Sequence, residues 1–219
     1  MSRESSSLLK RLILLGTPVA FAGVTLLHPM TSPDEPGLAV GRWWAVHLLQ
    51  IPLVILLAYC IWILLDGLRS TAATTARAAL PAFLVCFSAY DAVAGLATGW
   101  LARVAGEQSG VDQLATRRAI GELFNDNWLA GNFSVLGSAS AVAWAVVAIA
   151  GALALRRAGA DGLTVGLMAL SLVFVNHPAP TGTIGMLALF GAAFLWDRRR
   201  GRSAAPMSGA SAPAPSPQP

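Results

Sequence analysis

The sequence predicts an all-α, polytopic membrane helical bundle, and three observations lead to this prediction. Hydrophobic residues make up 55% of the 219 residues, whereas charged residues make up only 12%. A soluble domain carries about 25% charged residues, and the mean hydropathy of this chain is +0.62. The apolar residues also gather in runs long enough to cross a bilayer. We therefore expect six transmembrane helices and one amphipathic interfacial helix.

The first expected span covers residues 10–28. Its apolar part, Leu12 to Leu27, is slightly shorter than the ~20 residues that cross a ~30 Å hydrocarbon layer, and the aliphatic stem of Lys10 lengthens it. A cleaved signal peptide is the alternative, because Ala20-Phe21-Ala22 matches a cleavage motif. We favour a retained span because the apolar run continues past that motif.

The next three expected spans cover residues 43–65, 78–102 and 133–155. The Trp43-Trp44 pair opens the first of them and suits the aromatic belt at a membrane interface. The long polar stretch before the last of them carries apolar residues at three-and-four spacing, which predicts an amphipathic helix over 114–129. We expect this helix to lie in the plane of the interface rather than to cross the bilayer.

The last apolar region is interrupted by Asn176-His177-Pro178, and arginine clusters lie at both of its ends. An even number of crossings must therefore lie between these clusters. Two short or tilted spans, 162–176 and 182–197, meet this requirement, and a re-entrant hairpin is the alternative. The membrane domain then covers residues 1–202, and the tail 203–219, rich in Ser, Ala and Pro, is expected to be disordered.

The basic residues predict the orientation. With six spans, only four of the 15 Lys and Arg residues fall on one side of the membrane, namely Arg42, Arg103, Arg117 and Arg118. The positive-inside rule then puts both termini in the cytoplasm. We expect the protein in the inner (plasma) membrane of a bacterium. Because the basic residues lie at the ends of apolar runs and form no binding stripe, we expect the lipid bilayer as a partner and no nucleic acid.

The three histidines, His28, His47 and His177, all come out at the outer face of this topology. Histidine is the commonest metal ligand, so the three together could hold a transition metal, or two of them a haem. Carboxylates on the same side could complete such a site, namely Asp34, Glu35, Glu122 and Asp126. The alternative is that His28 and His177, which both precede a proline at a helix end, only bond helix carbonyls.

Asp91 is the second candidate, because it lies in the middle of the third expected span. An ionisable residue at the bilayer midplane is costly and marks a functional site by default. Ser88 shares its helix face, Tyr90 is adjacent, and His47 and Gln50 share an inward face of the second span. These five residues form a candidate ligand site or proton relay, with Asp91 ~10 Å deeper than His47 and linked to it through water. The alternative is that Asp91 is a hydrogen-bonded packing residue.

Three function classes follow. The first is a membrane-embedded binding or redox module with a histidine cluster above Asp91. The second is a small proton-coupled transporter centred on Asp91, and the third is a structural or partner-binding subunit without chemistry. We expect no enzyme, because the chain has no Walker loop, dinucleotide fingerprint, nucleophile elbow or zinc-protease motif. Small-residue seams such as Gly95 and Gly99 predict close helix contacts, within the chain, to partner helices or in a homo-oligomer.

Three segments carry a resemblance to a known group: LLHP, WWAVHLLQIP and YDAVAGLATG. With these segments the chain resembles multi-pass membrane proteins of high-GC bacteria that have no functional assignment. The resemblance covers most of the chain. It implies a multi-pass membrane fold and adds nothing about activity.

Overall fold

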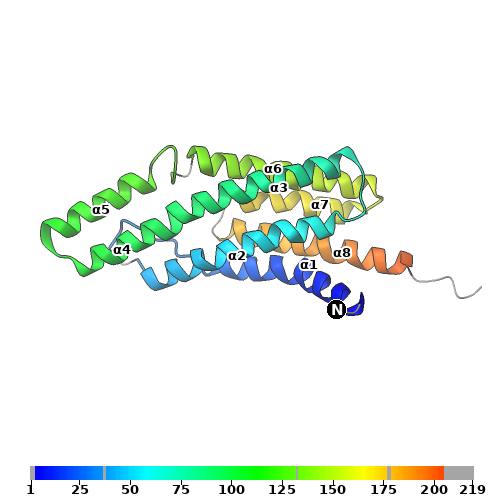
Figure 1. Ribbon diagram of the computed structural model, residues 1–219, viewed down its shortest axis with the longest axis horizontal. Coiled ribbons are helices and arrows are strands. Elements are labelled where there is room, and N and C mark those ends of the chain that lie inside the picture. Colours follow the sequence, from blue (N-terminus) through cyan, green and yellow to red (C-terminus); the bar gives the residue numbers. More distant parts are fainter. Residues whose placement is uncertain (1–2, 37, 132, 177–178, 205–219) are drawn as a thin grey trace, which may run out of the picture.

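The computed structural model describes residues 3–36, 38–131, 133–176 and 179–204, and this part of the chain is helical without any strand (Figure 1). A π-helix, η1 (Ala92–Ala97), joins the third and fourth α-helices, and a 3-10 helix, η2 (Ser171–Asn176), follows the seventh. The α-helices are α1 (Arg3–Leu26), α2 (Val40–Leu64), α3 (Thr71–Asp91), α4 (Thr98–Glu107), α5 (Gly110–Phe124), α6 (Val135–Arg157), α7 (Gly162–Leu170) and α8 (Thr181–Ala204).

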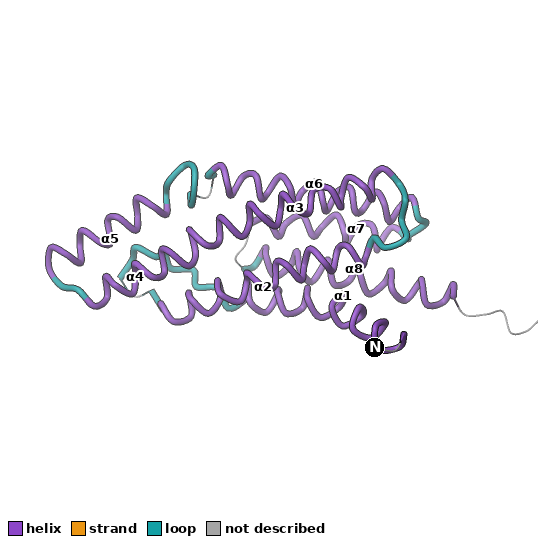
Figure 2. Tube along the Cα trace, viewed as in Figure 1, coloured by secondary structure: helices purple, strands orange, loops and turns teal. Residues whose placement is uncertain are grey.

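Six of these helices form a closed ring. Helix α1 contacts α2, α2 contacts α3, α3 contacts α6, α6 contacts α7, and α8 closes the ring between α7 and α1. Their axes run along the long dimension of the molecule, and the loops lie toward the two ends of the ring (Figure 2). Helix α1 begins and α8 ends at the same end (Figure 1). We call this the proximal end and the opposite one the distal end.

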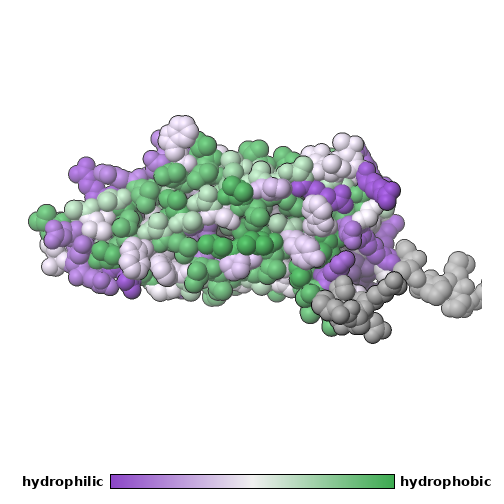
Figure 3. Space-filling view, in the orientation of Figure 1, coloured by the Kyte–Doolittle hydropathy of each residue, from purple (hydrophilic) through white to green (hydrophobic). Residues whose placement is uncertain are grey.

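Four helical segments are long and apolar enough to cross a membrane: Ser7–Leu26, Val40–Leu64, Thr71–Glu107 and Val135–Arg157. Gly162–Val175 is a shorter apolar segment. The visible face is compatible with a membrane protein, because hydrophobic residues cover its middle and hydrophilic residues gather toward both ends (Figure 3). The prediction of an all-helical fold with helices long and apolar enough to span a membrane is confirmed, whereas the count of six spans is not.

An aromatic cluster packs the centre of the ring. Its rings have centroid separations between 4.9 and 6.3 Å, mostly in edge-to-face or tilted geometry. The cluster joins α1, α3, α6 and η2 through Phe21, Phe83, Phe87, Trp144 and Phe174. The buried Trp144 indole needs an acceptor in this apolar core, and its Nε1 donates to the Ser171 carbonyl at 2.9 Å. The 3-10 segment thereby becomes part of the core.

The segment α3–η1–α4 is much longer than a bilayer is thick. It runs through 37 residues, Thr71–Glu107, or ~55 Å at 1.5 Å per residue, against a hydrocarbon core of ~30 Å. Helix α3 alone has 21 residues, ~32 Å, which matches the core. Its continuation, η1 and α4, extends past the start of α6 at the distal end (Figure 1).

Helix α5 packs back along this extension. Ile120 of α5 is buried against Ala102 and Ala105 of α4, and Arg117 Nη1 donates to the Asp34 carbonyl of the α1–α2 loop at 3.1 Å. The amphipathic helix predicted over 114–129 is thus observed over Gly110–Phe124. The structure confirms the helix but not its expected position in the plane of the interface, because it lies alongside α4 (Figure 1).

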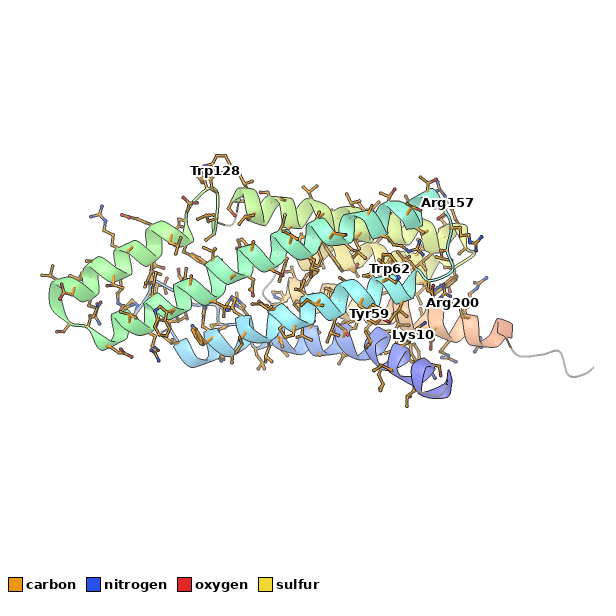
Figure 4. All side chains as sticks on the ribbon, in the orientation of Figure 1. Lys10, Tyr59, Trp62, Trp128, Arg157 and Arg200 are labelled. Carbon is orange, nitrogen blue, oxygen red and sulfur yellow. The ribbon has the colours of Figure 1, made fainter. Side chains whose placement is uncertain are left out.

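The proximal end gathers basic and aromatic side chains. Lys10, Arg157 and Arg200 lie there together with Tyr59 and Trp62 (Figure 4). Helix α8 continues to Ala204, slightly past the start of the predicted disordered tail. The remainder of that tail, 205–219, lies outside the described residues, as does His177.

Candidate functional site

The interface between α2 and the α3–η1–α4 segment contains four buried polar side chains, one of them a carboxyl group and one an imidazole. His47, Gln50, Asp91 and Thr98 are exposed by only 4%, 0%, 2% and 0%. Burying a polar group costs free energy unless it is hydrogen-bonded, so such a group of residues marks either a tight network or a binding site. This interface is the candidate site.

The site lies at the distal edge of the six-helix ring. His28, just beyond the end of α1, contacts His47. The ring of Tyr90 lies against Gly137 in the first turn of α6. Asp91, next to Tyr90, is therefore level with the end of α1 and the start of α6. The sequence predicts Asp91 at the middle of a span over residues 78–102, whereas the helical segment that contains it runs from Thr71 to Glu107. Its depth in a bilayer stays a prediction.

His28 and His47 face each other through their Nε2 atoms, which are 3.3 Å apart. The Nδ1 atom of His28 lies 2.7 Å from the Pro29 carbonyl, and that of His47 lies 2.8 Å from the Trp43 carbonyl. A carbonyl only accepts hydrogen bonds, so each Nδ1 carries the proton. In two neutral imidazoles, both Nε2 atoms then present lone pairs to each other, an arrangement that is repulsive unless a cation lies between them.

His28 lies in the loop after α1, outside the membrane-spanning segments. Desolvation by burial lowers the pKa of its imidazole, and the hydrogen bond to the Pro29 carbonyl opposes this shift more weakly. The neutral ring is therefore the favoured form of His28 at pH 7. The neutral imidazole is the form in which histidine binds metal ions.

Asp91 lies beside this pair. Its Oδ1 is 3.9 Å from His47 Nε2, and its Oδ2 has no hydrogen-bond partner among the described residues. The expected ~10 Å difference in depth is therefore wrong. Helix α2 begins at Val40 rather than at Trp43, so His47 lies about two turns inside the helix and reaches the level of Asp91.

The π-helix η1 starts directly after Asp91 and accommodates α2. Trp43 Nε1 donates to the Gly95 carbonyl at 2.7 Å, and Gly99 packs against the Trp43 and Trp44 rings. The close approach predicted from Gly95 and Gly99 is thus confirmed. Single-turn π-bulges frequently occur at functional sites. Here the bulge turns backbone toward the histidine pair.

The other three residues of the predicted relay, Gln50, Ser88 and Tyr90, lie at different places in the bundle. Gln50 is fully buried one turn further along α2, and neither atom of its amide has a partner among the described residues. Ser88 is half-buried on α3. Tyr90 is half-buried and faces α6 rather than α2. His47 and Asp91 therefore form the part of the predicted set that the contacts bring together.

The predicted carboxylates are engaged elsewhere. Asp34 accepts from the Ser32 hydroxyl, Glu122 pairs with Arg118 at 3.0 Å, and Asp126 accepts from two backbone amides of its own loop. Glu35 is exposed. Among the described residues, no three His, Cys, Asp or Glu side chains are arranged to hold a metal ion. His177, the third predicted ligand, lies outside them.

The chain matches no protein family, no curated protein and no solved structure. The function must therefore be argued from the residues of the site itself.

Two residues of the site were missed by sequence reasoning. Trp43 was expected in an interfacial belt, but it is 3% exposed and its ring lies 4.6 Å from that of His47. Gly95 was recognised as a packing glycine but not as the acceptor for Trp43. The four-residue spacing of Trp43 and His47, which places both on one helix face, was the available signal.

Proposed function

We propose that this protein is a six-span inner-membrane protein that binds a transition-metal ion between His28 and His47. The proposed site lies at the face of the inner membrane that points away from the cytoplasm. The observation that supports this most strongly is the pair of Nε2 atoms facing each other at 3.3 Å while both Nδ1 atoms bond backbone carbonyls. A cation between the two lone pairs turns their repulsion into coordination.

The separation of the two nitrogens suits a small ion. Imidazole nitrogens bind zinc at ~2.0–2.1 Å with tetrahedral angles, which puts two ligand nitrogens ~3.3–3.4 Å apart. A haem with both histidines as trans ligands would need ~4 Å between the nitrogens at the same bond length. The contacts therefore favour a mononuclear ion over a haem.

The surroundings resemble the outer shell of known metal sites. A metal-bound histidine usually donates its second ring N–H to a carbonyl or carboxylate, which fixes the ring and its tautomer. The Pro29 and Trp43 carbonyls fill this role for His28 and His47. Asp91 supplies a carboxylate with one unpaired oxygen beside the pair. Two imidazole ligands suit zinc, copper or iron.

The closed ring of helices supports six spans. Helices α7 and α8 complete the ring with the four segments that meet the length and apolarity of a span. Helix α7 leads away from the proximal end, where α6 ends, and α8 returns to it (Figure 1). An even number of spans puts both termini on one side. The basic residues of the proximal end favour the cytoplasm for that side.

Metal titration of the purified protein tests the proposal. The protein is stripped with a chelator in detergent and titrated with Zn²⁺, or with Co²⁺ to observe its absorption bands. The wild type is expected to bind about one ion, and His47→Ala and His28→Ala are expected to abolish binding. Glu122→Ala, which removes an exposed carboxylate at the same end, should leave binding unchanged. His177→Ala tests the third ligand predicted from the sequence. Wild-type protein that binds no metal would refute the proposal.

A proton-coupled function is the second candidate, and the 3.9 Å approach of His47 and Asp91 favours it. An imidazole and a carboxylate at this distance can exchange a proton through one water molecule. Proteoliposomes separate the two candidates. Proton flux that is lost in Asp91→Asn and needs no added metal would support a carrier, whereas absence of flux with retained metal binding would support the binding module.

A further inference from the structure

Three arginines meet at the turn between α6 and α7. Arg156 and Arg157 form the last turn of α6, and the turn continues from Ala158 to Asp161. Arg199 comes from α8, and its Nη2 lies 3.5 Å from the position that a Cβ on Gly159 would occupy. Two segments distant in sequence thus bring three arginines to the α6–α7 turn at the proximal end, the end at which Figure 4 also shows Arg200.

The carboxylates at this end do not neutralise Arg156 and Arg157. Both arginine side chains are exposed and make no ion pair or hydrogen bond with the described residues. Asp161 caps α7, since its two oxygens accept from Thr164 N and Thr164 Oγ1 at 2.9 and 3.0 Å. Asp197 pairs with Arg11 at 2.9 Å. Arg156 and Arg157 therefore carry positive charge that no ion pair with the described residues compensates.

In contrast to Arg156 and Arg157, other arginines at the same end donate hydrogen bonds within the protein. Arg77 donates to the Leu65 and Leu68 carbonyls at the end of α2, and Arg200 donates to the Asp66 carbonyl and lies over the Trp196 ring. These groups fasten the α2–α3 turn. Arg156 and Arg157 have no such structural task.

We propose that Arg156, Arg157 and Arg199 bind the phosphate of an anionic phospholipid headgroup. Arg157 ends the candidate span Val135–Arg157, so the turn lies at the depth of the headgroups. Guanidinium groups bind phosphate through charge-assisted, often bidentate hydrogen bonds. Basic clusters next to a span attract anionic lipids in particular, and the net positive charge of the turn favours a net negative headgroup over a zwitterionic one.

Thermal unfolding in nanodiscs tests this proposal. The wild-type protein is expected to melt several degrees higher in discs that contain phosphatidylglycerol than in discs of phosphatidylcholine alone. Arg156→Gln/Arg157→Gln should lose most of this shift. The matched control is Arg117→Gln/Arg118→Gln, a second adjacent pair, which lies at the distal end and whose side chains bond Asp34 and Glu122. This control should retain the lipid-dependent shift whatever its basal melting temperature.

Native mass spectrometry keeps the test decisive if the double variant does not fold. The wild type should retain phosphatidylglycerol at least several-fold more than phosphatidylcholine at equal concentrations, and Arg199→Gln should reduce this ratio. Equal retention of the two lipids by the wild type would overturn the proposal. An undiminished preference for phosphatidylglycerol in the folded Arg156→Gln/Arg157→Gln variant would also overturn the proposal. The two arginines would then only determine the membrane topology.

Discussion

Gly95 and His47 are in such close contact that a Cβ on Gly95 would lie 2.1 Å from Cδ2 of the imidazole. The π-helix therefore holds the ring on one side, while the Trp43 carbonyl holds Nδ1. With both constraints, Nε2 points at His28. The orientation of the proposed ligand His47 thus depends on a residue that has no side chain.

Gly95→Ala is predicted to destabilise the protein and weaken metal binding together. The added methyl group must displace the His47 ring, and overpacking of this kind costs typically ~1–3 kcal/mol. Thermal unfolding in detergent measures the first effect and Co²⁺ titration the second.

Gly166→Ala in α7 is the control, because a Cβ at this helical glycine meets nothing within 4 Å. This change should leave metal binding intact and be neutral or stabilising, because alanine favours the helix by up to ~1 kcal/mol. If Gly95→Ala melts and binds like the wild type, the imidazole is not held as described.

Asp91→Ala and Asp91→Asn are predicted to weaken metal binding by roughly 10–100-fold, the range observed for groups that support metal ligands. Both changes remove the carboxyl group beside His47, while asparagine keeps the shape of the side chain. The two variants should therefore lose similar affinity, although only Asp91→Ala leaves a cavity. Isothermal titration with Zn²⁺ gives the affinities, and thermal unfolding separates the cavity effect.

The exposed Asp112 in the first turn of α5 provides the matched control. Asp112→Asn removes one charge at the same end of the molecule and should leave the affinity unchanged. Affinities for Asp91→Asn equal to that of the wild type would exclude the carboxylate from the metal site and leave it as a packing residue.

Apolar runs predicted the helices well, because burial in lipid requires long apolar segments whatever their neighbours. Helix ends were predicted less well. The third span was expected to begin at residue 78, but α3 begins at Thr71, where the Ser70 hydroxyl accepts from Ala73 N at 3.2 Å and caps the helix. Such a serine is a start signal that the polar composition of the first turn concealed.

The site was predicted in part. His28, His47 and Asp91 were identified from the type of residue and its place relative to the spans. The contact between these residues was not predicted, because the depth of each residue along its span was counted from assumed span ends. In addition, no sequence pattern predicts that α3 continues through a π-helix. The role of Trp43 was missed for the same reason, since its partner is a carbonyl of that segment. Backbone irregularities depend on tertiary contacts, which local patterns do not encode.

Labelling of introduced cysteines is predicted to place the two ends of the molecule on opposite sides of the membrane. Val111 at the start of α5 is 81% exposed, and Val111→Cys should react with a membrane-impermeant maleimide in intact cells. Ala158→Cys, exposed in the α6–α7 turn, should react only after the membrane is permeabilised, because an excess of basic residues keeps that end in the cytoplasm. The native Cys60 and Cys86, buried and half-buried within spans, give the background in wild-type cells. Reaction of both introduced cysteines in intact cells would contradict the six-span topology, and the reverse pattern would invert it.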